Sequence, residues 1–258
     1  MIVRGVIYSL YALLTLPVIC VIGASLTAGD FLSFPPDGLS LRWYSAFFAD
    51  RELMRGAWIS LAIAAATTAA TVAIGVPAAL FLESDPPWRR LIGSLFLSPL
   101  NIPLVLTGFA MLVLFTRLNL VNATGLFIGH VVVTVPYMVR TILSSLALTD
   151  PALPRAAAIF GAGPFRIFRH VTLPLLKPGL ISGCVFVFLA SLNNVALSVF
   201  IASPGSSPLP VVIFSRMDSV ASPSIAAGAT LLILFTAGCV FAFERRYSLL
   251  GPLTGGRI

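Results

Sequence analysis

Charged residues are scarce in this sequence. They make up 10% of the 258 residues, whereas soluble proteins carry about 25%. Hydrophobic residues make up 58%, and a soluble chain of this length could not bury so much apolar surface while covering itself with polar groups. The same composition excludes disorder, because disordered chains are rich in charge and poor in aliphatic residues. The chain is therefore an integral membrane protein.

Residues that commonly build catalytic or metal sites are also few. The sequence has three cysteines, all within apolar runs, and its two histidines, His130 and His170, lie far apart without a cysteine or carboxylate at ligand spacing. An odd number of cysteines builds no disulfide framework, and we interpret them as small core residues. Neither a phosphate-binding glycine loop nor a catalytic carboxylate pair is visible. We expect no metal site, no catalytic residue and no cofactor bound by this chain.

Six apolar stretches are long enough to cross a bilayer, which requires about 20 residues of helix. They cover residues 6–27, 58–82, 92–115, 125–148, 179–202 and 224–243. The first could be a signal peptide, but its apolar run exceeds the usual signal core of about 7–15 residues and no clear cleavage site follows, so we interpret it as a helix. The predicted fold class is an all-α integral membrane protein with six transmembrane helices.

The formal charge of +7 is distributed asymmetrically. If both termini are cytoplasmic, the inner segments hold 11 cations, among them Arg89, Arg90 and Arg257, and 4 acids, among them Asp85, while the outer segments hold 5 of each kind. The whole excess then lies on the inner side, as the positive-inside rule expects. The sequence thus predicts an N-in, C-in topology, and the charge indicates topology rather than a nucleic-acid partner.

The longest inner connection contains signals for two short helices. Asp150 can cap a helix that Pro151 begins, and Gly161 can end it in a left-handed conformation. Pro164 begins a second helix over residues 165–172, which Pro174 and Pro178 are expected to end before the fifth span. The basic second helix could lie on anionic lipid, or the pair could dock on a cytoplasmic partner.

This connection also carries a recognisable motif. Arg155-Ala156-Ala157, Gly161 four positions on, and Val171-Thr172-Leu173-Pro174 after nine more residues fit the spacing of the E-A-A-x3-G-x9-I-x-L-P pattern. That pattern is typical of permease subunits of type I bacterial ATP-binding-cassette importers, which this chain resembles. Residues 38–44 (GLSLRWY) and 129–137 (GHVVVTVPY) are similar to the spermidine/putrescine permease branch. The resemblance covers residues 31–246.

The resemblance implies that residues 149–178 form a coupling segment seated in a groove of an ATPase subunit. The implied coupling residues are Arg155, Ala156, Ala157, Gly161, Pro164, Arg166, Arg169, Leu173 and Pro174. Arg155 stands where the family has glutamate, so an acid-mediated contact cannot be carried over. The implied domains are a first helix with an outer interfacial loop (1–55), a type I transmembrane domain (56–246) and a cytoplasmic tail (247–258).

The implied partners are a second, similar permease subunit, two ATP-binding-cassette ATPase subunits, an external solute-binding protein and the lipid bilayer, without nucleic acid. The ATPase subunits would bind ATP and Mg²⁺, so this chain would not itself be an enzyme. The implied location is the bacterial inner membrane.

Polar residues at membrane depth are candidates for lining a transport pathway, because an unpaired amide in lipid costs several kcal/mol. The candidates are Asn101, His130, Thr134, Tyr137, Asn193 and Asn194. Each could instead hydrogen-bond between helices and fix their packing. A kink is expected at Asn101, which lies between two prolines, and the three candidates from 130 to 137 share one helix face.

The favoured function is one permease half of an ATP-driven importer for a small organic solute, polyamine-like or another amino compound. Members of the branch often have an acidic stretch in the fifth span, where this chain has Leu192-Asn193-Asn194, and this weakens the assignment of a polyamine. The alternative is an ion-coupled carrier or channel without an ATPase. Such proteins usually place charges within their spans, and here Arg140 is the only charge well within a predicted span. A membrane scaffold without transport explains the polar residues less well.

Overall fold

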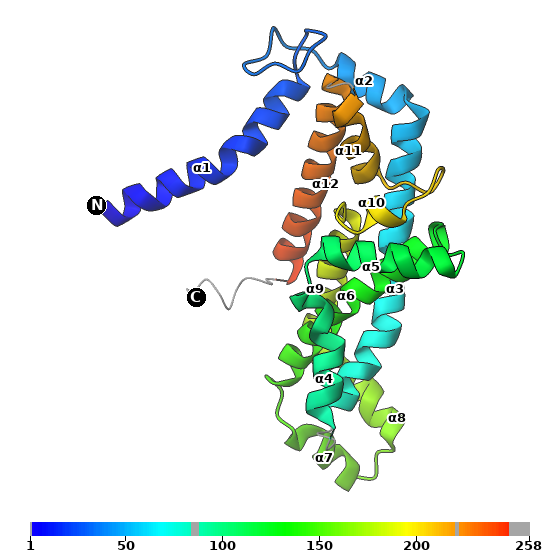
Figure 1. Ribbon diagram of the computed structural model, residues 1–258. Coiled ribbons are helices and arrows are strands. Elements are labelled where there is room, and N and C mark those ends of the chain that lie inside the picture. Colours follow the sequence, from blue (N-terminus) through cyan, green and yellow to red (C-terminus); the bar gives the residue numbers. More distant parts are fainter. Residues whose placement is uncertain (1, 84–87, 220–221, 248–258) are drawn as a thin grey trace. The chain divides into compact units, whose positions relative to one another are not determined.

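A computed structural model describes residues 2–83, 88–219 and 222–247 (Figure 1). The regular elements of these residues are all helices. Five of the described helices are long and apolar enough to cross a membrane, and a bent pair can supply a sixth span. The predicted all-α membrane fold is confirmed. Asp85, Arg257 and the tail from residue 248, which entered the charge and domain predictions, lie outside the described residues.

The five long helices carry most of the apolar residues. They are α1 (Ile2–Ser25), α3 (Arg51–Glu83), α6 (Ala123–Leu146), α9 (Leu173–Leu192) and α12 (Pro223–Tyr247). Shorter elements connect them. These are α2 (Arg42–Ala49), α7 (Ala152–Ile159), α8 (Pro164–Ile167), the π-helical turn η2 (Phe168–Thr172), α10 (Ser198–Ile201) and α11 (Leu209–Ser219).

The third predicted span is the bent pair. Helix α4 (Arg89–Leu97) leads into the 3₁₀ turn η1 (Ser98–Asn101), and α5 (Leu104–Arg117) leaves at an angle of 104°. Pro99 lies within η1 and Pro103 directly precedes α5. Because proline lacks a backbone donor, it interrupts the hydrogen-bond ladder of a helix. The kink expected at Asn101 is therefore present.

The fifth span ends earlier than predicted. Helix α9 stops at Leu192, and residues 193–197 form an irregular break before α10. Asn194 Oδ1 accepts a hydrogen bond of 3.0 Å from the backbone N–H of Leu197. Asparagine side chains that bond nearby backbone groups compete with helix continuation. The prediction of one helix across residues 179–202, with the two asparagines at its middle, was wrong.

The fifth span also begins earlier than predicted. Elements α8, η2 and α9 follow one another without interruption, so residues 164–192 form a single helix of 29 residues. The expectation that Pro174 and Pro178 end the second short helix was wrong, because both lie inside this continuous helix. Pro174 lies just after the π-helical turn. Proline normally removes a hydrogen bond at an interior position, and local π-helical adjustments allow membrane helices to continue past it.

The chain divides into two compact units, which are described separately. The first comprises residues 1–60 and 205–238, and the second comprises residues 61–204 and 239–258. In the first unit a core gathers side chains from α2, α3, α11 and α12: Phe47, Leu53, Leu209, Val212, Ile213 and Ile225.

In the second unit, α6 and α9 make the most extensive contact between the described helices. Two glycines allow this close approach. A Cβ atom at Gly179 would lie 2.5 Å from Cβ of Ser145, and one at Gly183 would lie 2.6 Å from Sδ of Met138. Small residues at four-residue spacing commonly pack membrane helices in this way. The α6–α9 pair is thus the framework on which the candidate site residues are placed.

Candidate functional site

Helix α7 is formed by the local signals that the sequence predicted. Asp150 Oδ1 accepts a hydrogen bond of 2.8 Å from the backbone N–H of Ala152. At the other end Gly161 has φ +80°, and the N–H of Ala162 reaches the carbonyl of Ala157 at 3.0 Å. Glycine adopts this left-handed conformation without steric cost. Residues 149–178 therefore contain one separate short helix, α7, followed by a second that continues into α9.

The surface of this segment is apolar as well as basic. Ile159, Phe160 and Phe165 expose 84%, 91% and 73% of their surfaces, and we call these three residues the apolar tip. Figure 1 shows α7 and α8 at one end of the second unit. Of the predicted coupling residues, Ala157 and Leu173 are half-buried. The exposed ones are Arg155, Ala156, Gly161, Pro164, Arg166, Arg169 and Pro174.

His130 lies in the interior of the second unit. Its side chain is 1% exposed, and its ring nitrogens lie 2.7 Å (Nδ1) and 2.8 Å (Nε2) from the hydroxyl oxygens of Ser191 and Ser198. One ring nitrogen of a neutral imidazole donates and the other accepts. Because Ser191 lies near the end of α9 and Ser198 begins α10, His130 bridges the break in the fifth span. Thr134 is equally buried and donates to the His130 carbonyl at 2.6 Å.

The remaining pathway candidates are distributed over two places. Asn101 and Tyr137 are exposed and lie on η1 and α6, which contact each other. Asn193 is exposed at the break, where its Nδ2 donates to the carbonyl of Leu189 at 3.0 Å, whereas Asn194 is 8% exposed. The structure thus places His130 and Thr134 in the interior and leaves Asn101, Tyr137 and Asn193 on the surface.

Arg140 lies on the same exposed face of α6 as Tyr137. The sequence had indicated Arg140 only as a charge within a span and not as a candidate for lining a pathway. Arg140 lines a cavity of 410 Å³ in the second unit together with Leu97, Leu100, Asn101, Leu143, Ser144 and Ala147. The spacing of residues 137, 140 and 144 puts all three on one helical face, and this spacing could have revealed the stripe.

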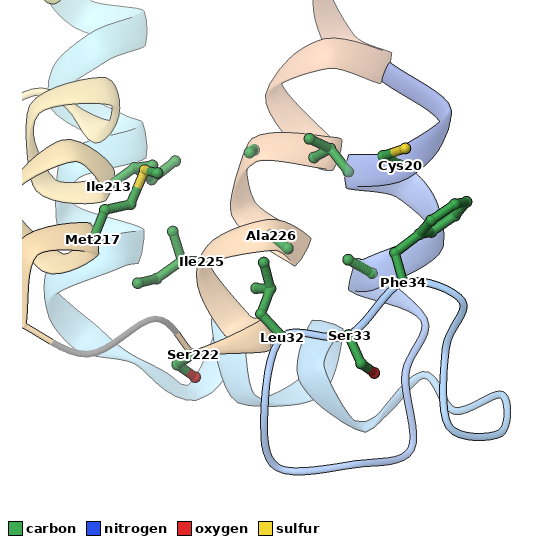
Figure 2. A pocket seen from close by; sticks show the side chains of 12 residues that line it. Cys20, Leu32, Ser33, Phe34, Ile213, Met217, Ser222, Ile225 and Ala226 are labelled. Carbon is green, nitrogen blue, oxygen red and sulfur yellow. The ribbon is translucent and has the colours of Figure 1, made fainter. Parts of the chain in front are cut away.

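A second cavity, of 460 Å³, lies in the first unit and is almost entirely apolar (Figure 2). Leu32 and Phe34 reach it from the loop after α1, Cys20 from α1 itself, and Ile225 and Ala226 from α12. Cys20 thus serves as a small apolar lining residue. A cavity with so few polar groups provides little to orient a polar solute.

Comparisons with known proteins identify the family of this chain. The family described as "Binding-protein-dependent transport system inner membrane component" matches residues 71–252. The putrescine transport system permease protein PotI of Escherichia coli K12 is 33% identical over 207 residues, covering 76% of this chain and 73% of the relative. The spermidine/putrescine transport system permease protein PotC of the same organism is 30% identical over 243 residues, covering 93% and 91%.

Solved structures share the fold. A chain of a bacterial alginate transporter, in complex with an alginate-bound periplasmic protein, has a TM-score of 0.72 at 14% identity, covering 95% of this chain and 93% of its own. A chain of the MetNI methionine transporter in an inward-facing conformation has a TM-score of 0.66 at 20% identity, covering 76% and 94%. The chain is thus a multi-pass membrane protein of the binding-protein-dependent transport system inner membrane component family, a permease subunit of an ATP-binding-cassette importer.

Proposed function

We propose that this permease subunit pairs with a second, similar permease and that a small organic amino compound passes between them. The transmembrane domain would span residues 56–246 in a bacterial inner membrane, with both termini in the cytoplasm. An external solute-binding protein would deliver the solute, and two ATPase subunits would bind and hydrolyse ATP with Mg²⁺. The two Escherichia coli relatives are putrescine and spermidine/putrescine permeases, which supports an amino compound.

The apolar tip is the observation that supports the docking of an ATPase subunit. Three large apolar side chains, Ile159, Phe160 and Phe165, are exposed together beside the exposed cations Arg155 and Arg166. Exposed apolar patches with a polar rim are typical of protein–protein interfaces, and aromatic and arginine side chains dominate their binding energy. Residues 149–178 are therefore proposed as the coupling segment.

The continuous helix over residues 164–192 supports a mechanical role for this segment. A load applied at Phe165 passes along α8, η2 and α9 without an intervening loop. Closure of the ATPase subunits would thus displace the fifth span directly and change which side of the membrane the pathway opens to. Asn101, Tyr137 and Asn193 are proposed to line this pathway, and His130, Thr134 and Asn194 to hold the helices around it.

Co-purification tests the proposal. Tagged wild-type chain should carry down an ATPase subunit and support ATP hydrolysis in reconstituted membranes. Phe160→Ser should weaken this association, because it removes a side chain that is 91% exposed. Leu118→Ser is the matched control, since Leu118 is also exposed, at 55%, but lies after α5. Uptake without any associated ATPase would instead indicate an ion-coupled carrier.

A further inference from the structure

An arginine on α6 lines a cavity at the bend of the third span. Arg140 lies six residues before the end of α6, and the cavity of 410 Å³ that it lines is also bounded by Leu97 and Asn101 from the bent pair. Ligand pockets commonly have volumes of about 300–1,000 Å³. The cavity is therefore large enough for a small solute or for one end of a longer one.

The polar groups of this cavity are not engaged elsewhere. Within the part of the chain that the structure describes, the side chains of Asn101, Arg140 and Ser144 make no hydrogen bond or ion pair. All three are exposed. A guanidinium group and an amide are strong donors, and a hydroxyl can also donate. The cavity thus presents several donors and a full positive charge without a protein acceptor.

No Asp or Glu is among the residues that line this cavity, and the acidic residue nearest to a lining residue in the chain is Asp150, three positions after Ala147. Over residues 2–83, 88–219 and 222–247, each Asp or Glu lies either between helices or within four residues of a helix end. The interiors of the described spanning helices therefore offer no carboxylate to a cationic solute. A polyamine passing Arg140 would meet a charge of its own sign, and like charges repel.

We propose that the Arg140 cavity binds an anionic oxygen group, carboxylate or phosphoryl, of the transported solute, so that the substrate is a zwitterionic amino compound rather than a polyamine. The planar guanidinium fork of arginine matches the paired oxygens of such groups. Asn101 and Ser144 supply further donors at the same cavity. This inference rests on the proposed function, since it concerns the solute that the importer carries.

The test uses the assembled importer in phosphatidylcholine nanodiscs and three probes, two of which have the same number of carbons. Putrescine and 4-aminobutyrate each have four carbons and differ in that a carboxylate replaces one terminal aminomethyl group; 3-aminopropylphosphonate supplies a phosphoryl probe. At equal ionic strength, the two acidic probes should raise the melting temperature of the complex and putrescine should not. Arg140→Gln should weaken 4-aminobutyrate binding about tenfold, the loss expected for one charge-assisted hydrogen bond.

Two variants control this measurement. Arg140→Lys keeps the charge but loses the fork, so a smaller shift should remain. Arg117→Gln removes an exposed cation from the last turn of α5, outside the cavity, and should leave probe binding unchanged. The inference is overturned if putrescine stabilises the complex as well as 4-aminobutyrate does, if no acidic probe binds, or if Arg140→Gln binds like wild type.

Anionic lipid is the other source of the same chemistry. Nanodiscs with and without phosphatidylglycerol separate the two sources. If phosphatidylglycerol stabilises the complex through Arg140 while the soluble probes have no effect, Arg140 binds a lipid headgroup and the inference fails. Failure of the proposed function is seen earlier and separately, because then no complex with an ATPase would be obtained for the nanodiscs.

Discussion

Arg216 and Asp50 form a two-point ion pair between α11 and the start of α3. Nη1 lies 2.6 Å from Oδ2 and Nη2 lies 3.2 Å from Oδ1, and the same guanidinium also pairs with Glu52. Asp50 Oδ1 additionally accepts the backbone N–H groups of Glu52 and Leu53, at 2.9 and 3.0 Å. The hydrogen bond from Arg216 lowers the pKa of the Asp50 carboxyl below its usual value. One carboxylate thus caps α3 and holds α11 in place.

Substitutions at Asp50 separate these two roles. Asp50→Asn keeps an acceptor for the first turn of α3 but loses the ionic attraction, which is worth about 0.2–1 kcal/mol for a partly exposed pair. Asp50→Ala also loses the cap, a further loss of about 1 kcal/mol. Thermal unfolding in detergent at pH 7 should therefore rank wild type above Asp50→Asn and Asp50→Ala lowest.

The same pair predicts a pH dependence. Because the folded-state pKa of Asp50 is lowered, its ionic contribution is complete above the usual carboxyl pKa of 3.8 and is lost as the pH falls through the folded-state pKa. The difference in melting temperature between wild type and Asp50→Asn should shrink toward zero in that acidic range. A difference that stays constant down to pH 3 would contradict this assignment.

Removing the His130 side chain should destabilise the second unit. His130→Ala leaves the hydroxyls of Ser191 and Ser198 without their present partner in the interior, and hydrogen bonds between membrane helices contribute about 0.6–2 kcal/mol each. His130→Gln can restore one of the bonds and should lose less. Ser182→Ala, which removes an exposed bond to the carbonyl of Pro178 in the same helix, is the control and should melt near wild type.

Single cysteines can test which pathway candidates face water. In a chain whose three native cysteines are replaced by alanine, cysteines at positions 101 and 137 should react with a membrane-impermeant maleimide in the assembled importer. Cysteines at 130 and 134 should not react, because both native side chains are 1% exposed. Labelling at 134 with protection at 101 would reverse the proposed assignment of pathway and packing residues.

Gly161 and Gly163 can serve as a test position and a control position in the proposed coupling segment. Gly161 has φ +80°, where a side chain costs about 1–2 kcal/mol, whereas Gly163 has φ −68° and open space around it. Gly161→Ala should therefore uncouple ATP hydrolysis from uptake, and Gly163→Ala should not. Gly161→Asn should be intermediate, since asparagine tolerates the left-handed region. Equal coupling in all three variants would remove Gly161 from the proposed mechanism.

The sequence predicted those features that depend on local signals. Asp150 and Gly161 define α7 because a cap and a left-handed glycine act within one turn. The two prolines around Asn101 likewise produced the expected bend. In contrast, the apolar run from 179 to 202 contains no proline and no glycine near residue 193. Hydrophobicity alone therefore predicted an unbroken helix there.

Other features depend on contacts between distant residues. The break at Asn193 is held by His130, which is more than 60 residues away along the chain, and spacing within one helix cannot reveal such a partner. The burial of His130 and the exposure of Arg140, only ten residues apart on α6, depend on where α9 and η1 pack against that helix. The spacing of residues along one helix therefore could not distinguish a buried position from one that lines a cavity.

The unbroken helix from Pro164 to Leu192 has a consequence for how the two ends of the fifth span communicate. Phe165 and Ser191 lie on one continuous helix, which includes the π-helical turn η2, and are separated by on the order of 39 Å at about 1.5 Å per residue. A rotation of this helix about its own axis turns both residues through the same angle. Because Ser191 meets His130 at 2.7 Å, even a small rotation would strain or break that bond. A rotation at the opposite end of the helix should therefore change the His130–Ser191 distance.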